Sequence, residues 1–183
     1  MKKRVVITLG LVFATMMIGA SGCGVSSGQG GNAQTAENAS AESSADNAGV
    51  QKTALKPGEI YEKIKATYTL PEMYEADADW LMNYYGIDAG MLSDYVFAEA
   101  DEVHADRVII LNVADSGNVA EVEEKLEAVL GQLSSQEMLD YLPDQADIIT
   151  SARIKQEGNT LYLVISPDAE GIEEIIKSGL LGE

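Results

Sequence analysis

The single histidine of the 183-residue chain, His104, stands among acidic residues at a spacing that could hold a metal ion. In an extended segment Glu102, His104 and Asp106 share one face, because side chains of a strand alternate between its two sides. An imidazole and two carboxylates on one face are groups that can bind a divalent cation. A solvated turn between two strands explains the same residues, and we favour that interpretation.

Aromatic residues gather in one short segment that contains Trp80, Tyr84 and Tyr85. Large aromatic side chains with a polar end often line binding surfaces. At helical spacing they more often pack in a core, and this is the commoner arrangement. We keep the three residues as the candidate binding surface beside that alternative.

The only cysteine, Cys23, has surroundings that indicate a covalent modification. The chain starts Met-Lys-Lys-Arg, continues with an apolar run over residues 5–18 and reaches small residues before the cysteine, a pattern typical of an export signal. As a helix the 14-residue run would measure about 21 Å, short of the ~30 Å hydrocarbon core of a bilayer. Ala20-Ser21-Gly22-Cys23 resembles the bacterial lipobox, although Ala20 stands where leucine is commonest. The resemblance implies a diacylglyceryl thioether on Cys23, with acyl chains such as palmitate.

Several classes of active site are excluded by residues that the chain lacks. With Cys23 modified and one histidine, neither a cysteine–histidine pair nor a multi-histidine zinc site can form. Ser-x-x-Lys, His-Glu-x-x-His and phosphate-binding glycine loops are absent. Thirty acidic residues leave a carboxylate-pair hydrolase open. The sequence thus indicates no catalytic residue and no cofactor.

The charge of the chain restricts its partners. It has 30 acidic and 12 basic residues, and removal of Lys2, Lys3 and Arg4 with the signal would leave 30 against 9, a formal charge of −21. Such a chain has no basic surface for nucleic acid, and anionic lipid headgroups should repel it. We therefore expect no nucleic-acid partner, and contact with the membrane only through the lipid on Cys23.

The composition divides the chain into three parts. Residues 1–22 form the predicted lipoprotein signal peptide. Residues 23–56 hold the lipidated cysteine and a tether of mainly small and polar residues, which has too little apolar surface to fold. Residues 57–183 have the apolar content of one domain, large enough for a core without disulfides.

The periodicity within residues 57–183 predicts an α+β domain in the order α-α-β-β-α-β-β-α, with a mainly antiparallel sheet of about four strands packed with helices. The expected helices cover residues 57–68, 77–85, 119–131 with a continuation to 142, and a last one that Ser166-Pro167 begins. The expected strands cover residues 93–100, 107–113, 148–156 and 160–165, and a short helical turn covers 88–92.

Two of these strands are apolar on both faces, so both faces of the sheet need cover. We expect the two later helices to cover one face. Either the N-terminal helices or a second copy of the chain covers the other, and we favour the first, leaving a homodimer as the alternative.

Residues 73–176 resemble an uncharacterised family of small lipoproteins from Firmicutes-type bacteria, known as a domain of unknown function. The similarity lies in residues 81–88 (Leu-Met-Asn-Tyr-Tyr-Gly-Ile-Asp), the strand over 108–113, Tyr141-Leu142-Pro143, and the Gly158-Asn159 hairpin that leads into residues 162–166. The resemblance implies a location and domain boundaries, and no chemistry.

These observations predict a lipid-anchored protein on the extracytoplasmic side of the cell membrane. We expect a non-catalytic binding or accessory module at the cell surface, whose partner is a protein or a cell-wall component. The alternative is a small carboxylate-dependent hydrolase that acts on cell-wall or glycan material.

Overall fold

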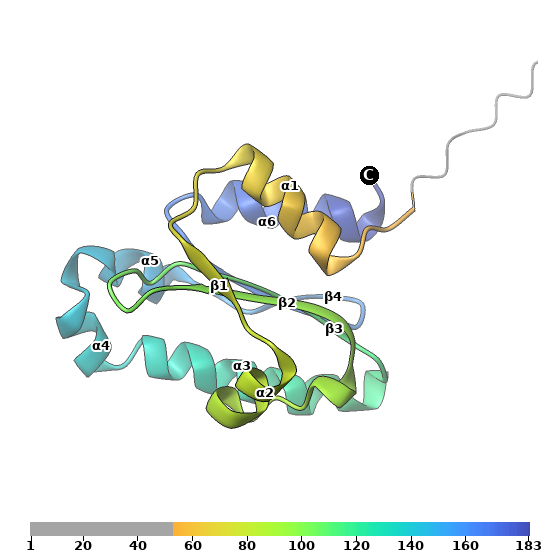
Figure 1. Cartoon of the computed structure of the whole chain (residues 1–183), viewed down its shortest axis with the longest axis horizontal. Coiled ribbons are helices and arrows are strands. Elements are labelled where there is room, and N and C mark those ends of the chain that lie inside the picture. The colour runs from red at the N-terminus through yellow and green to blue at the C-terminus, as the bar shows by residue number, and fades with distance from the viewer. Residues whose placement is uncertain (1–52) are drawn as a thin grey trace, which may run out of the picture. The chain divides into compact units, whose positions relative to one another are not determined.

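A five-stranded antiparallel sheet lies between two layers of helices (Figure 1). The computed structural model describes residues 53–183. The sheet has the strand order β1-β2-β3-β5-β4, and every neighbouring pair is antiparallel. The elements are α1 (Pro57–Thr67), β1 (Met73–Glu75), α2 (Ala78–Trp80) with a π-helical turn (Leu81–Tyr85), a 3₁₀ turn (Ala89–Met91), β2 (Leu92–Ala100), β3 (Arg107–Val113), a 3₁₀ turn (Ser116–Asn118), α3 (Val119–Leu133), α4 (Gln136–Tyr141), a 3₁₀ turn (Pro143–Gln145), α5 (Ala146–Ser151), β4 (Lys155–Glu157), β5 (Thr160–Ile165) and α6 (Ala169–Leu181).

One helical layer consists of α1 and α6, which lie together above the sheet in the view of Figure 1. Pro57 begins α1, where its fixed φ and missing N–H are best tolerated. Glu59 accepts a hydrogen bond from the N–H of Lys56 at 2.9 Å, which satisfies one free donor at the helix start. Ile60 and Ile64 of α1 are fully buried against the sheet, where they meet residues such as Ile110.

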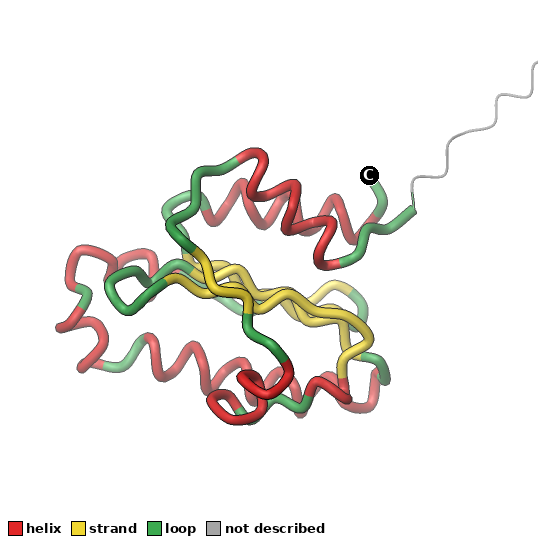
Figure 2. Tube along the Cα trace, viewed as in Figure 1, coloured by secondary structure: helices red, strands yellow, loops and turns green. Residues whose placement is uncertain are grey.

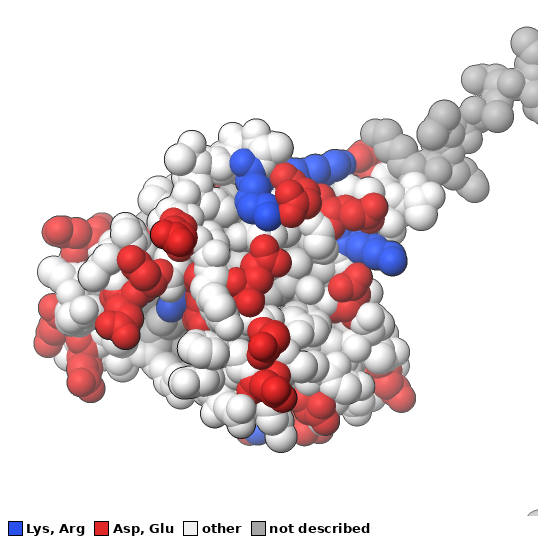
Figure 3. Space-filling view, viewed as in Figure 1, with Lys and Arg blue, Asp and Glu red and all other residues white. Residues whose placement is uncertain are grey.

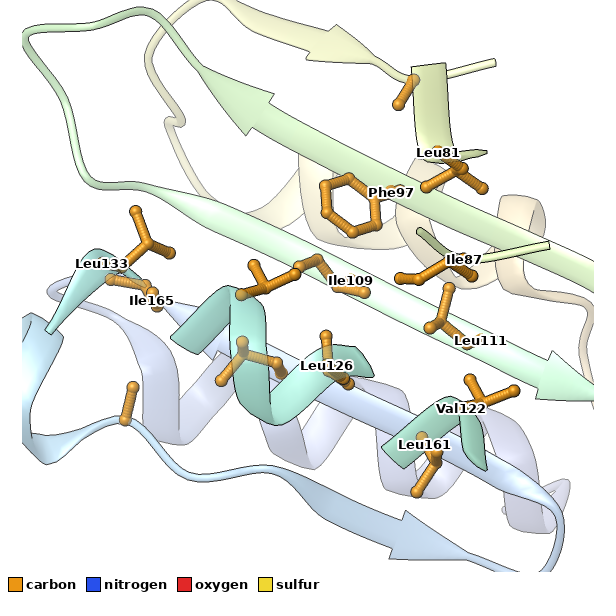
Figure 4. Close-up of a cluster of buried hydrophobic side chains, with 14 of the residues drawn as sticks. Leu81, Ile87, Phe97, Ile109, Leu111, Val122, Leu126, Leu133, Leu161 and Ile165 are labelled. Carbon is orange, nitrogen blue, oxygen red and sulfur yellow. The ribbon is translucent and has the colours of Figure 1, made fainter. Parts of the chain in front are cut away.

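The other layer holds α3 and the α2 segment, with α4 and α5 beside them (Figures 1 and 2). The apolar face of α3 packs on the opposite side of the sheet from α1. The side chains that meet there include Leu81, Ile87, Phe97, Ile109, Leu111, Val122, Leu126, Leu133, Leu161 and Ile165 (Figure 4). Two separate apolar cores, one on each face, therefore hold the three layers together.

The α+β class and the antiparallel sheet predicted from the sequence are confirmed, with five strands where about four were expected. Helices of the same chain cover both faces of the sheet, as we favoured. One detail was wrong, because α3 and α6 lie on opposite faces. Each later helix shares its face with an N-terminal helical segment.

Two further predictions need correction, and one strand was missed. Residues 148–151, expected in a strand, belong to α5, and only Lys155–Glu157 of that stretch pair with β5. Strand β1 was not predicted. The last helix does not begin at Ser166-Pro167. Its N-cap residue is Asp168 and its first residue is Ala169, while Ser166 Oγ accepts a hydrogen bond from the N–H of Asp168 at 3.2 Å.

Within residues 53–183 no helix is long and apolar enough to cross a membrane. The predicted export signal, Cys23 and most of the predicted tether lie outside the described residues. Their predicted roles stay predictions.

Candidate functional site

A row of polar side chains crosses one end of the sheet. Tyr74 of β1 pairs with Glu99 of β2, Glu99 pairs with Arg107 of β3, and Arg107 pairs with Ile165 of β5. Paired residues of neighbouring strands point to the same face, and so do residues two apart in one strand. The row therefore extends the face that carries Phe97 and Ile109, at the point where the apolar core ends.

The carboxylate of Glu99 is the centre of this row. Only 7% of the residue is exposed, yet two hydrogen-bond donors and one cation reach it. Trp80 Nε1 donates to Oε1 at 3.0 Å, Tyr85 OH donates to Oε2, and Arg107 Nε lies 3.3 Å from Oε2. An ionised carboxylate has no donors of its own, so these contacts replace the water that burial removed.

The α2 segment positions two of those donors. Asp77 caps its start by accepting from the N–H of Trp80 at 2.8 Å, and Gly86 ends it in the left-handed region at φ 63°. Residues five apart on a regular α-helix lie about 140° apart around its axis, from 3.6 residues per turn. The wider π turn at Leu81–Tyr85 reduces that angle, so that Trp80 and Tyr85 both reach Glu99.

The aromatic rings form a contiguous surface over this end of the sheet. Trp80 stacks on Tyr84 with ring centres 4.1 Å apart, and Tyr74 approaches Trp80 at 5.1 Å with the planes tilted by 57°. Tyr74 and Tyr84 are 49% and 62% exposed. Tyr85 instead turns inward and stacks on Phe97 at 4.6 Å. Burial, followed by its contact with Glu99, raises the pKa of the Tyr85 hydroxyl, which therefore stays a donor at neutral pH.

A surface hollow of about 570 Å³ opens beside Tyr74, Trp80 and the Glu99–Arg107 pair. We call it the β1 hollow. Its lining is Glu72, Met73, Tyr74, Trp80, Glu99, Ala100, Asp101, Glu102 and Arg107. Two smaller hollows, of about 290 and 150 Å³, also reach Arg107 from the side of α4. A volume of this size with aromatic walls and a few fixed polar groups is typical of a ligand site.

The structure places the three predicted aromatic residues in different surroundings, and it does not bring the predicted metal ligands together. Trp80 lines the β1 hollow, Tyr84 stacks behind it, and Tyr85 is part of the core rim. His104 binds Asp101 through Nδ1 at 2.6 Å in the turn between β2 and β3. Within the part of the chain that the structure describes, no three histidine, cysteine, aspartate or glutamate side chains are grouped to hold a metal ion.

The other two residues of that turn have different surroundings. Glu102 is exposed and lines the β1 hollow. Asp106 is buried, and its burial raises the pKa of the carboxyl. The turn is therefore exposed at Glu102 and His104, as in the solvated turn that we favoured, whereas Asp106 is buried.

Sequence reasoning did not identify Glu99 and Arg107. The available signal was an acidic residue between Ala98 and Ala100, on the same strand face as Phe97. Period-2 alternation makes Glu99 point inward with Phe97, and an inward carboxylate requires donors. Which donors these are depends on β1 and the π turn, and neither was predicted.

Comparison with family profiles gives one assignment. Residues 66–166 match the family described as Domain of unknown function (DUF4358). The match covers more than half of the chain. The chain belongs to the DUF4358 family. The DUF4358 region contains β1, the α2 segment, β2 and β3, and so every residue that lines the β1 hollow. Neither curated proteins nor solved structures gave a match.

Proposed function

We propose that this DUF4358 protein is a lipid-anchored binding module on the extracytoplasmic side of the cell membrane, with the β1 hollow as its ligand site. The observation that carries the binding role is an aromatic-walled hollow built around a buried carboxylate–guanidinium pair. A purely structural rim would not require that Tyr74 and Tyr84 stay about half exposed beside it. The location rests on the sequence around Cys23 and on the implied kinship with bacterial lipoproteins.

The lipid would act as the membrane contact. Each buried methylene contributes about 0.8 kcal/mol, and a single acyl chain holds only marginally. Two or more acyl chains on Cys23 would therefore be needed to keep a protein of formal charge −21, counted without the signal peptide, at a surface whose headgroups repel it.

Binding is a better proposal than hydrolysis of cell-wall or glycan material. A carboxylate hydrolase needs one carboxyl that can give a proton and another that can attack or activate water. Glu99, the buried acid of the hollow, already accepts hydrogen bonds from Trp80 and Tyr85 and forms an ion pair with Arg107. Among residues 53–183, no specific contact favours the hydrolase.

The anchor is tested by Cys23→Ala, compared with Ser27→Ala as a control in the same segment. Membranes are washed with alkaline carbonate and both variants are followed by immunoblot. We expect the alanine variant at Cys23 to leave the membrane pellet and the control to stay. A Cys23→Ala protein that remains in the washed pellet would refute the lipid anchor.

The binding role is tested by a photo-crosslinking amino acid at Tyr84, whose side chain is exposed and whose loss leaves the Glu99 contacts intact. The same amino acid at Glu124, exposed on α3, is the control. Irradiation of intact cells should give a reproducible adduct at position 84 alone. Adducts at neither position, or the same adducts at both, would contradict a specific site at the hollow.

A further inference from the structure

We propose that the β1 hollow accepts the lysine or arginine side chains of a basic, extended segment of a partner protein. The inference rests on the proposed binding role of the same hollow and assigns the chemistry of its partner.

The charge of the lining selects a cation. Four carboxylates line the hollow, from Glu72, Glu99, Asp101 and Glu102, against the one guanidinium of Arg107. Arg107 is matched by Glu99 at 3.3 Å, so the other carboxylates leave an excess of negative charge. Acidic side chains also predominate over the face shown in Figure 3. A cationic partner would be attracted at long range and then held at the hollow.

The aromatic wall favours the same guest. Tyr74 and Trp80 line the hollow with their planes at 57° and their centres 5.1 Å apart, so two ring surfaces meet at an angle. Ammonium and guanidinium groups bind over such faces, with a gain in affinity of about two- to fivefold per exposed ring. Arginine or lysine would thus combine ring contacts with the carboxylates of Glu72 and Glu102.

The edge of the sheet indicates that the cation belongs to a peptide. Strand β1 is outermost in the sheet and pairs only with β2. The N–H of Ala76 donates to the carbonyl of Phe97 at 2.8 Å, so Ala76 and, two residues earlier, Tyr74 direct their backbone groups to β2. The alternating residues, Met73 and Glu75, direct theirs to the free edge. An extended peptide can add there as a further strand and place alternate side chains at the hollow.

The chain contains its own reporter, because Trp80 is its only tryptophan. The full chain is purified in a nonionic detergent, and Trp80 emission is followed at 50 mM NaCl. The probes are an alternating lysine–threonine hexapeptide, the glutamate–threonine counterpart, tetramethylammonium and a neutral chitin-type oligosaccharide. Calorimetry gives the affinities independently of fluorescence.

We expect saturable binding of the lysine–threonine peptide alone, with tetramethylammonium at least about tenfold weaker. The double variant Glu72→Gln/Glu102→Gln should lower the affinity for the lysine–threonine peptide by about tenfold or more. Tyr74→Ala should lower it by about two- to fivefold. The matched control is Glu124→Gln/Glu127→Gln, which removes the same charge from the exposed face of α3 and should change the affinity less than twofold. Thermal unfolding verifies that each variant is folded.

The other outcomes overturn the inference. An equal loss in both double variants would show that only overall charge attracts the peptide. If tetramethylammonium bound with the same affinity as the peptide, the hollow would be a site for a small cation. A response to the oligosaccharide alone, or no response to any probe together with a specific adduct at Tyr84, would refute the basic partner and leave the binding role standing. No response and no adduct would refute both.

Discussion

Glu99 lies on β2 where the apolar core of this sheet face ends, and its neighbours explain why a buried carboxylate is tolerated there. It follows Phe97 on the same face and is 7% exposed. A buried charge is stable only if it is paired and hydrogen-bonded. Arg107 supplies the charge and Trp80 and Tyr85 supply further donors, so the residue fixes the α2 segment against β2 and β3.

We predict that Glu99→Gln lowers the free energy of unfolding by roughly 2–3 kcal/mol, somewhat below the loss typical of a broken, fully buried ion pair. The amide cannot neutralise Arg107, whose side chain is 12% exposed. It also has one accepting oxygen, whereas Trp80 and Tyr85 donate to separate oxygens of the carboxylate. Urea unfolding measures the loss. Glu102→Gln, an exposed neighbour in the same hollow, should stay within about 0.5 kcal/mol. Equal stability of the two variants would mean that the Glu99 contacts contribute nothing.

A second residue-scale prediction concerns pH. Burial raises the pKa of Asp106 above its ordinary 3.8, so as pH rises the unfolded chain releases this proton before the native one. The parent therefore loses stability from about pH 4 until the pH exceeds the raised native pKa. Asp106→Asn does not ionise, and its stability relative to the parent should increase with pH across that window.

The control for this prediction has the opposite sign. The hydrogen bond from His104 lowers the pKa of Asp101, so its contribution is present above about pH 4 and is lost as pH falls. Asp101→Asn should therefore lose stability relative to the parent as pH rises. Urea unfolding from pH 3 to pH 8 follows both variants, and parallel curves for Asp106→Asn and the parent would contradict the buried carboxyl.

The aromatic half of the site was accessible to sequence reasoning and the charged half was not. Trp80 and Tyr84 are large, close in sequence and few in number, so they could be singled out directly. Glu99 is one of 30 acidic residues, and only its register opposite Tyr74 and Arg107 makes it special. Register depends on contacts between distant segments, which local patterns do not contain.

At the scale of elements, α1 and α6 pack closely because α6 has glycines on the contacting side. A Cβ at Gly179 would lie 2.8 Å from Ile60 Cγ1, and Ile60 is fully buried. The two helices can therefore approach each other only where α6 lacks a side chain.

We predict that Gly179→Ala lowers the free energy of unfolding by about 1–2 kcal/mol, because overpacking outweighs the gain in helix propensity. The matched control is Gly131→Ala in α3, where a Cβ meets nothing within 4 Å. That variant should gain roughly 0.5–1 kcal/mol. Thermal and urea unfolding measure both changes, and a stabilising Gly179→Ala would show that Ile60 moves aside.

The misassigned elements share a physical cause. The segment around Ile148 and Ile149 has the β-branched residues of a strand, but Ile149 packs into the core as part of the short helix α5. Strand β1 has only three residues, too few for an alternating pattern. Tertiary contacts decide short elements, whereas α3 and β3, with long periodic runs, were predictable from local pattern.

At the scale of the whole molecule, the cover of the sheet bears on assembly. Both faces are occupied by helices of the same chain, so a partner copy is not needed to bury Ile110 or Ile109. The two edge strands of the sheet, β1 and β4, have only three residues each. The edge at β4 carries the charged residues Lys155 and Glu157, which discourage pairing with another strand. The formal charge of −18 adds repulsion between copies.

We therefore predict that the domain over residues 53–183 is monomeric in 0.15 M salt. Light scattering should give the mass of one chain at every concentration tested, because neither sheet face nor the acidic surface offers a self-complementary patch. At low salt the repulsion extends further, so association should weaken still more. A mass that rises toward two chains with concentration would restore the homodimer and would place its interface outside the two sheet faces, which are already filled.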